Sequence, residues 1–530
     1  GRASRKEERV IDIKELGYKV QAKYPLIHVE THEEERFLQY VRSALESRTV
    51  WEWSATEGLA TEAKDGRRQI SETEDFVAAL GQIRRLAGEK DGETFRRQLV
   101  VLKDVQPYMD FAVVRRHLRD LSIILPHTNT VVVLLGPELK IPNDLEKAIT
   151  VYEFPLPDEE EMKKLAQAVQ HQNKHRIKPA HNEQDLGRVA RACLGLTRDE
   201  AENVLAKSAA KHGRLDLAEI AAEKRELLKK AGLEVREPKK KLSDLGGLGQ
   251  LKDYLARVNK VRTSPDAKTY GLTAPRGIAL LGPPGNGKSA ICDAIAAEFE
   301  VPLIVFDVGQ FQGSLVGESQ AKLRSAFARI NAIGPSVVRF DEMEKMFAGM
   351  TGPSTDSGVK QEMGGMTLTW LQERPEGSYV VATMNRVIDA GGNLLVVPEM
   401  LRKGRWDELW ILDLPEEDEK AQILAIHLAK RGRDPKKFDL AAIAREARGF
   451  SGSELEQAIV EALFYAFYED REVETDDILE VVSRTSPIAA AMKEEIGRLR
   501  DWATSRNIRQ ASAKARKAPL TAKGGVREVL

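Results

Sequence analysis

The chain has 530 residues, of which 42% are hydrophobic and 31% are charged, a balance typical of globular proteins with about two to four domains. Its 81 basic and 82 acidic residues give a formal net charge of -1, so no overall charge attracts nucleic acid or an anionic membrane. The two cysteines, Cys193 and Cys292, argue against a disulfide framework and a cysteine-based metal site.

Signals for membrane targeting are missing from the sequence. The charged residues 1–19 lack the apolar segment of a signal peptide. The longest apolar runs, such as residues 131–135, have strand length and are too short to cross a bilayer. We therefore expect a protein of the cytoplasm, or of the plastid stroma if the source is a photosynthetic eukaryote, with no membrane span.

Strand-like apolar runs alternate with helical patterns in the first half of the chain. The runs cover residues 26–29, 98–102 and 130–135, and residues 158–230 follow as an all-helical segment. This alternation predicts an α/β module with a parallel sheet over residues 18–230, preceded by a tail over residues 1–17. Pro238 and three lysines favour an exposed linker over residues 231–243.

A phosphate-binding pattern follows the strand predicted at Gly277–Leu281. It has the form G-x-x-x-x-G-K-[ST] and consists of Gly282, Pro283, Pro284, Gly285, Asn286, Gly287, Lys288 and Ser289, with a helix from Ala290 onward. Small residues let backbone N–H groups surround an anion, and the helix N-terminus adds a favourable dipole. We predict ATP along residues 282–290, with Lys288 on its β and γ phosphates and Ser289 on Mg²⁺.

Two later strands end in polar residues. The run at 337–341 delivers Asp341 and Glu342, and the run at 379–383 is followed by Asn385. Ligands of α/β sheets bind at the carboxyl ends of strands. We therefore predict that Asp341 holds Mg²⁺, that Glu342 acts as general base on the attacking water, and that Asn385 orients this water or touches the γ phosphate. A cap at the strand end is the alternative for Asn385, and Arg339 inside the run has no explanation in the sequence.

Arg402 and Arg405 follow the strand predicted at residues 379–383. A phosphoryl-transfer site requires a cation on the developing negative charge. Because these arginines lie beyond the sheet, we expect them to reach the nucleotide of a neighbouring subunit as arginine fingers. Surface ion pairs are the alternative.

Residues 489–530 begin as a helical stretch and end in a basic segment that includes Arg506, Arg509 and Lys514. A solvated, disordered tail is the main interpretation of this segment. A contact with a partner or with nucleic acid is the alternative.

An internal repeat connects the two halves of the chain. Residues 185–195 match residues 439–449 without a gap, and residues 142–147 match residues 398–403 in the same order. Both regions predict a helix, a glycine turn and a new helix capped by Thr197 or Ser451. The repeat favours a duplicated module, with the second copy divided into an α/β part at 244–414 and a helical lid at 415–488.

These motifs, in this order, resemble the AAA+ ATPases, and specifically the AAA subfamily. The resemblance covers nearly all of residues 242–487, and it implies that Gly246 and Gly452 border the adenine and ribose. The tandem layout also resembles a family encoded by a conserved open reading frame of plastids and cyanobacteria, which implies ATPase activity without naming a substrate.

The first module resembles the second without its chemistry. Its first strand leads into an acidic helix start instead of a phosphate loop, and Lys103-Asp104 stands where the second module has Asp341-Glu342. The repeat also places Glu146 and Ile149 where the second module has Arg402 and Arg405. We predict that the first module binds no ATP and serves as a scaffold, substrate adaptor or regulator.

Leu315, Val316 and Gly317 stand where AAA+ unfoldases of this type carry a central-pore loop with an aromatic residue. The aliphatic pair weakens the case for processive threading and leaves one-step remodelling open. Residues 350–358 are a candidate second pore loop, and subunit-contact loops are the alternative for both segments.

The sequence thus predicts an ATPase that assembles into a homo-oligomeric ring, a hexamer, and remodels a protein or protein complex. A nucleic-acid motor or loader is the second hypothesis, because the C-terminal segment and Lys239–Lys241 are basic. A slow nucleotide-gated structural switch is the third, because the pore-loop position lacks an aromatic residue.

Overall fold

The computed structural model describes residues 13–45, 47–63, 66–137, 139–177, 181–311, 318–347, 357–388, 394–395, 398–402 and 404–512. By contacts, the chain divides into two compact units. The first comprises residues 1–227 with Ala321–Ile333, and the second comprises Leu228–Gln320 with residues 334–530. Among the described helices, none combines the length and apolar composition that a membrane crossing requires. Leu315 to Gly317 and most of 350–358 lie outside the described residues.

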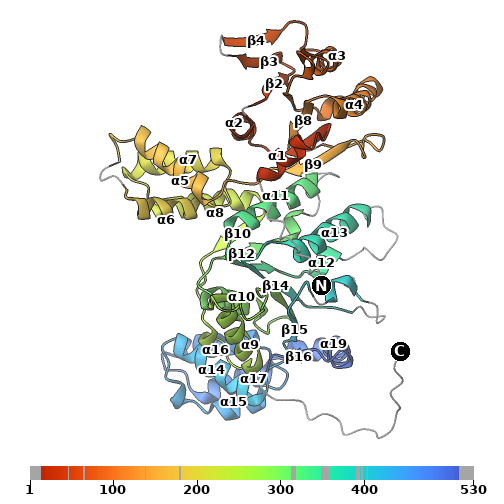
Figure 1. The fold of residues 1–530 in the computed structure, drawn as a ribbon. Helices are drawn as coiled ribbons and strands as arrows, with labels where there is room; N and C mark the ends of the chain where they lie inside the picture. The colour runs from red at the N-terminus through yellow and green to blue at the C-terminus, as the bar shows by residue number, and fades with distance from the viewer. Residues whose placement is uncertain are drawn as a thin grey trace, which may run out of the picture. The chain divides into compact units, whose positions relative to one another are not determined.

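A seven-stranded sheet with the order β4-β3-β2-β7-β8-β1-β9 forms the centre of the first unit (Figure 1). Neighbouring strands are parallel except along β2-β3-β4, an antiparallel extension that the sequence analysis did not predict. The strands are β1 (Leu26–Glu30), β2 (Thr49–Ser54), β3 (Gly58–Ala63), β4 (Gly66–Ile70), β7 (Gln98–Lys103), β8 (Thr130–Gly136) and β9 (Ile149–Glu153). A separate short hairpin pairs β5 (Lys90–Asp91) with β6 (Thr94–Phe95).

Both faces of this first sheet are covered by helices. In β7, Leu99 and Val101 share a core with α1 (Ile13–Gln21) and α2 (Glu34–Ala44). The alternate residues Val100 and Leu102 share another core with α3 (Phe76–Ala87) and α4 (Ala112–Ile124). Because both faces are buried, the parallel strands appear in the sequence as continuous apolar runs.

A helical group with its own apolar core follows β9. Its helices are α5 (Glu159–Gln172), α6 (Glu183–Cys193), α7 (Arg198–His212) and α8 (Leu217–Lys230). Thr197 caps α7 as the repeat predicted, because its side chain accepts a bond from Glu200 N while the Glu200 carboxylate accepts one from Thr197 N.

Helix α11 (Glu318–Ile333) contributes most of its length to the first unit, although the strands before and after it in the sequence belong to the second. Arg329 donates hydrogen bonds of 2.9 and 3.0 Å to the Glu200 carboxylate and one of 3.2 Å to the Gly195 carbonyl. Gly195 has a φ of 88°, and a Cβ there would lie 2.5 Å from the Ile333 side chain. The chain therefore passes between the units at three points, not only through the predicted linker.

The second unit contains a seven-stranded sheet with the order β10-β12-β13-β14-β11-β15-β16. Its strands are β10 (Leu233–Arg236), β11 (Gly277–Leu281), β12 (Leu303–Phe306), β13 (Ser336–Phe340), β14 (Ser378–Met384), β15 (Glu408–Ile411) and β16 (Arg509–Gln510). All neighbours are parallel except β10 and β12. The helices that belong to this part are α9 (Gly249–Thr263), α10 (Lys288–Glu298), α12 (Glu344–Phe347) and α13 (Ser357–Glu373).

Both edges of the second sheet correct the sequence analysis. Part of the predicted linker is β10, because its backbone pairs with β12 and Leu233 is buried. Part of the predicted basic tail is β16, which follows α18 (Ile488–Ala491) and α19 (Lys493–Ser505). Arg509 of β16 pairs with Trp410 and lies 3.2 Å from Glu408, so this arginine belongs to the sheet.

The predicted lid is a helical group with a core of its own. It consists of α14 (Glu417–Lys430), α15 (Leu440–Glu446), α16 (Gly452–Tyr468) and α17 (Thr475–Arg484), drawn in blue in Figure 1. Ser451 caps α16 through the same reciprocal bonds that Thr197 makes at α7, here with Glu454.

The duplication predicted from the repeat is confirmed by the two sheets. In each sheet, the first parallel strand in chain order lies between the fourth and the fifth. These are β1 between β8 and β9, and β11 between β14 and β15. When the ends of β1 and β11 are aligned, the strand registers put Lys103 at the position of Asp341 and Asp104 at that of Glu342. The same alignment corrects both equivalences taken from the repeat. Counting back from β9 puts Asp144, not Glu146, at the position of Arg402, and Lys147, not Ile149, at that of Arg405.

The Arg329–Glu200 pair yields a first test. Burial alone raises the pKa of Glu200, but the bonds from Arg329 and Thr197 outweigh it and hold the pKa below its usual range. Such a lowered carboxyl pKa contributes stability above the unfolded value of 4.5, which is lost as the pH falls through the folded pKa. We expect Glu200→Gln to lower the free energy of unfolding at pH 7 by about 1–3 kcal/mol, and by less near pH 4. Chemical denaturation of the full chain at both pH values measures this.

The matched control is Glu57→Gln, which removes a carboxylate from an exposed pair with Arg67. Exposed pairs contribute little, so this variant should unfold almost as the wild type does. Equal effects of the two substitutions would show that the Arg329–Glu200 pair does not hold α11.

Candidate active site

The predicted phosphate loop joins β11 to α10. Gly285 and Gly287 have φ angles of 83° and 78°, in the left-handed region that glycine adopts without steric cost. A Cβ on Gly282 would lie 2.1 Å from the carbonyl oxygen of Leu412. The loop therefore requires glycine where the motif has it, and it leads directly into the amino end of α10, where backbone N–H groups favour an anion.

Lys288 is the first residue of α10, and only 7% of it is exposed. Its Nζ donates to the carbonyl oxygens of Gly282 at 2.6 Å and of Pro283 at 2.9 Å. Burial lowers the pKa of Lys288 to about 8, although nearby carboxylates counteract this. The ammonium is thus held against its own loop, from which we expect it to turn to phosphate oxygens when a nucleotide binds.

The carboxyl ends of β13 and β14 bring three predicted residues together. Phe340 pairs with Ala382, so Asp341 and Glu342 emerge beside the end of β14 and next to Asn385. Asn385 Nδ2 donates to Glu342 Oε1 at 3.0 Å. All three residues line the cavity described below. Asn385 therefore contacts the predicted base, which the capping alternative does not explain.

Two charged residues that the sequence analysis did not assign support this group. Glu344 is buried, which raises its pKa, and its Oε1 accepts a 3.0 Å hydrogen bond from the backbone N–H of Asn385. Arg339, which had no explanation in the sequence, lies with Nη2 3.3 Å from Asp341 Oδ2. An arginine within an apolar strand was the available signal for an ion-pair partner nearby.

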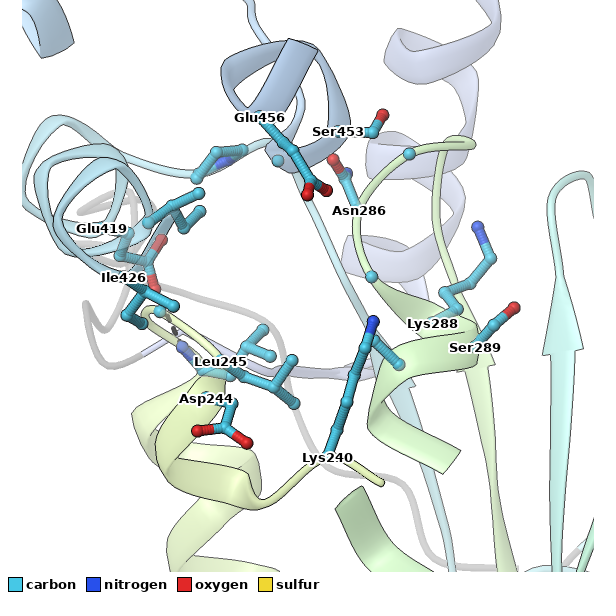
Figure 2. A pocket seen from close by; sticks show the side chains of 18 of the residues that line it. Lys240, Asp244, Leu245, Asn286, Lys288, Ser289, Glu419, Ile426, Ser453 and Glu456 are labelled. Carbon is cyan, nitrogen blue, oxygen red and sulfur yellow. Dashed lines mark hydrogen bonds between the residues drawn. The ribbon is translucent and has the colours of Figure 1, made fainter. Parts of the chain in front are cut away.

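A cavity of about 1010 Å³ opens beside these residues, between the sheet and the lid of the second unit (Figure 2). Its volume suits a nucleotide-sized ligand. The phosphate loop with Asn286, Lys288 and Ser289 lies on one side, and Glu419 and Ile426 of the lid lie on the other. Ser453, at the start of the lid helix α16, lies beside the phosphate loop, where its backbone N–H donates to the Gly285 carbonyl at 3.1 Å. Predicted residues along its wall are Pro284, Gly285, Asn286, Gly287, Lys288, Ser289, Ala290, Asp341, Glu342, Asn385, Gly246 and Gly452.

Other wall residues were not predicted. Lys239 and Lys240, which the sequence analysis placed in the linker, line the cavity. Ser512, just beyond β16, lines it too and donates a 3.0 Å hydrogen bond to Glu419 Oε2. The other oxygen of Glu419 accepts from Leu248 N at 3.1 Å, so Glu419 links the lid to the segment before α9 and to the segment after β16.

The two predicted arginine fingers differ in their surroundings. Arg405 is half-buried and its guanidinium donates to the carbonyl oxygen of Glu399. The side chain of Arg402 is 72% exposed, and its Nη2 lies 3.9 Å from Glu399 Oε1. Neither arginine lines the cavity. Arg402 is therefore the one whose guanidinium is accessible to another molecule.

The oxygen donors fit a nucleotide-bound Mg²⁺. Within the described residues, no three His, Cys, Asp or Glu side chains gather into a metal-binding group. The Ser289 hydroxyl and the Asp341 carboxylate both line the cavity. These hard oxygens are ligands that Mg²⁺ prefers, and phosphate oxygens commonly supply the rest.

Four family models match successive parts of the chain. Residues 13–154 match the N-terminal domain of the SpoVK-like AAA ATPases, and residues 159–231 match the second domain of the same family. Residues 278–410 match the ATPase family associated with various cellular activities, AAA, and residues 437–481 match the AAA+ lid domain.

Several curated proteins are similar along nearly the whole chain or along about half of it. The "Uncharacterized AAA domain-containing protein ycf46" of Guillardia theta is 34% identical over 508 residues, which cover 94% of this chain and 96% of that protein. Its counterpart in Trieres chinensis is 32% identical over 94% of this chain and 98% of that protein. The "ATP-dependent zinc metalloprotease FtsH 3" of Sphaerobacter thermophilus is 29% identical over 47% of this chain and 50% of that protein.

Two substitutions test the site. Lys288→Ala removes the buried ammonium, so we expect nucleotide binding to the full chain to fall from one molecule per chain to none. Glu342→Gln keeps the loop intact, so we expect ATP to bind normally while hydrolysis falls by about 10²–10⁴-fold, as expected for loss of a general base. Equilibrium binding of labelled ATP and phosphate release measure the two effects.

Lys260→Ala, in an exposed position of α9, is the control for Lys288→Ala. It should leave both measurements unchanged. Nucleotide retained by the Lys288→Ala chain would mean that the first unit, or another surface, binds it.

Proposed function

Since the chain belongs to the family of AAA ATPases represented by the ycf46 proteins, we propose that it forms a ring in which ATP hydrolysis drives the remodelling of a protein or protein complex. ATP hydrolysis and the AAA fold with its lid follow from the family. The ring, its arginine fingers and its protein substrate are the proposed part. We also propose that it works in the cytoplasm or, in a photosynthetic eukaryote, in the plastid stroma.

In the proposed mechanism, the residues around the cavity divide the work of phosphoryl transfer. The loop N–H groups and Lys288 hold the β and γ phosphates. Glu342 accepts a proton from the attacking water, and Asn385, bonded to Glu342, keeps that carboxylate oriented. Ser289 and Asp341 would hold Mg²⁺, which would neutralise negative charge on the phosphates.

The composition of the cavity wall carries the ring proposal. Among the described residues that line the cavity, none is an arginine. Phosphoryl-transfer sites of this kind gain much of their rate from an arginine on the developing charge. Arg402 is exposed, lies outside its own cavity and has a carboxylate only at 3.9 Å. These facts support an arginine supplied by a neighbouring subunit, and thus a homo-oligomer, for which we propose a hexamer.

The first unit is proposed to bind no nucleotide. Only residues 31–33 separate β1 from α2, whereas residues 282–287 separate β11 from α10. The carboxylate of Glu33 accepts a 2.6 Å hydrogen bond from the backbone N–H of Arg198 at the start of α7. The N-terminus of α7 is therefore already occupied by a carboxylate of the same chain. The three-residue connection between β1 and α2 and the Glu33 carboxylate at α7 leave no phosphate-binding loop here, which supports a role as scaffold, substrate adaptor or regulator.

The alternative functions have less support. Lys239 and Lys240, part of the basic stretch that motivated a nucleic-acid motor, line the nucleotide cavity. The basic residues after Ser512 lie outside the described part of the chain. A remodelling enzyme should hydrolyse ATP faster when its protein substrate is added. A slow nucleotide-gated switch should show little such acceleration. A pull-down with Glu342→Gln in ATP, with its retained proteins identified, supplies candidate substrates.

Complementation between two inactive variants tests the ring. Arg402→Ala should lower kcat by about 10³-fold or more if Arg402 acts on a neighbour's nucleotide. Mixed with Glu342→Gln, it should form rings in which some interfaces combine an intact Glu342 with an intact Arg402. We therefore expect the mixture to hydrolyse ATP faster than the sum of its components, measured as phosphate release after subunit exchange.

Arg405→Ala serves as the comparison, since this side chain is bonded to the Glu399 carbonyl of its own chain. Mixing Arg405→Ala with Glu342→Gln should therefore restore less activity than mixing Arg402→Ala with Glu342→Gln. Activity of the mixture equal to the sum, together with a monomeric Glu342→Gln chain in ATP and Mg²⁺, would refute the ring.

A further inference from the structure

Thr383, on β14, makes hydrogen bonds to three consecutive residues at the end of β13. Its Oγ1 donates to Asp341 Oδ1 at 2.6 Å and accepts from Glu342 N at 3.1 Å, and its carbonyl oxygen accepts from Met343 N at 3.0 Å. Thr383 is 1% exposed. A hydroxyl has one proton to donate, so donation to Asp341 leaves its lone pairs for the Glu342 amide. One buried hydroxyl thus contacts both carboxylate residues of the site.

The backbone of Glu342 is unusual where Thr383 holds it. Its φ is 50°, in the left-handed region that residues other than glycine seldom occupy. Such conformations persist when surrounding bonds determine them. The amides of Glu342 and Met343 are both bonded to Thr383, so this residue fixes the direction in which the Glu342 side chain leaves the backbone.

The first sheet shows whether the turn at Glu342 needs the hydroxyl of Thr383. The strand registers place Leu135 at the position of Thr383, and Asp104, at the position of Glu342, has a similar φ of 52°. The amide of Asp104 is bonded to the Leu135 carbonyl at 3.0 Å. The turn therefore forms without a hydroxyl, which is present only in the sheet that carries Asp341 and Glu342.

From this comparison we propose that Thr383 is a positioning residue for ATP hydrolysis, whose hydroxyl fixes the Asp341 carboxylate for Mg²⁺ and ties that carboxylate to the amide of Glu342. The proposal rests on the roles given above to Asp341 and Glu342. Arg339 lies 3.3 Å from Asp341 Oδ2, so Thr383 and Arg339 hold opposite oxygens of this carboxylate. Groups that orient metal ligands in this way strongly affect metal affinity and activity.

Thr383→Val removes the hydroxyl while keeping the shape of the side chain, and Thr383→Ser keeps the hydroxyl. In the full chain we expect Thr383→Val to lower kcat by about 10–100-fold, with a much smaller change in KM. Equilibrium binding of a non-hydrolysable ATP analogue should need about tenfold or more Mg²⁺ for half-maximal effect. Binding measured in EDTA should be unchanged, and Thr383→Ser should recover most of the Mg²⁺ response and kcat.

Thr367→Val is the matched control. Thr367 is likewise fully buried, and its hydroxyl donates to the Met363 carbonyl at 2.9 Å within α13. This variant should lower the melting temperature without changing kcat or the Mg²⁺ dependence.

A Thr383→Val chain that loses stability as Thr367→Val does, yet keeps its kcat and Mg²⁺ dependence, would overturn the inference. Failure of Thr383→Ser to restore them would do the same. A wild-type chain that binds no ATP would refute the proposed function, and this inference with it. A monomeric chain with a normal Thr383→Val response would refute only the ring.

Discussion

The parallel pairing of β11, β13 and β14 is the constraint on which the site depends. Leu281 pairs with Met384, and Phe340 pairs with Ala382, so the three strands end at one edge of the sheet. The phosphate loop, the carboxylate pair and Asn385 begin at these ends. A slip of one residue would turn every side chain to the opposite face. The hydrogen-bond ladder therefore determines which polar groups meet before any of them contacts a ligand.

The parts of the site that the sequence predicted are local in the chain. The phosphate loop is one continuous segment whose glycines have a steric reason, and the fold class follows from the alternation of strands and helices, which the structure and the family confirm. Asp341 and Glu342 stood out because two carboxylates followed an apolar run. Such signals need no knowledge of what lies across the sheet.

The parts that were missed depend on pairings between distant segments. Thr383 looks like an ordinary strand residue until its register against β13 is known, because threonine is common in strands. The strand β16 consists of Arg509–Gln510, too short to produce an alternating pattern, and Ser512 reaches the cavity because β16 pairs with β15. The basic character of its surroundings suggested a tail, whereas Arg509 is paired with Glu408.

The first unit shows that the backbone and the chemistry of this fold are separable. The left-handed residue after the third parallel strand is retained at Asp104, but Lys103 precedes it, and the phosphate loop is replaced by three residues, 31–33. Arg36, 5% exposed, is bonded to Glu33 and Glu161. Charges that would disfavour ATP are thus satisfied within the unit, and they help to hold its sheet and helices together.

In the first unit, the sheet edge that corresponds to the predicted nucleotide site of the second unit is contacted by a helix. Glu30 ends β1 as Leu281 ends β11, and Glu200 takes part in the cap of α7 as Glu454 does in that of α16. These two carboxylates bind Arg324 and Arg329 of α11, with Arg324 Nε 2.9 Å from Glu30 Oε1. Helix α11 ends at Ile333, and β13 begins at Ser336. The helix that contacts Glu30 and Glu200 therefore leads directly into the strand that ends at Asp341 and Glu342. In the first unit, this edge therefore contacts a helix of the same chain, α11.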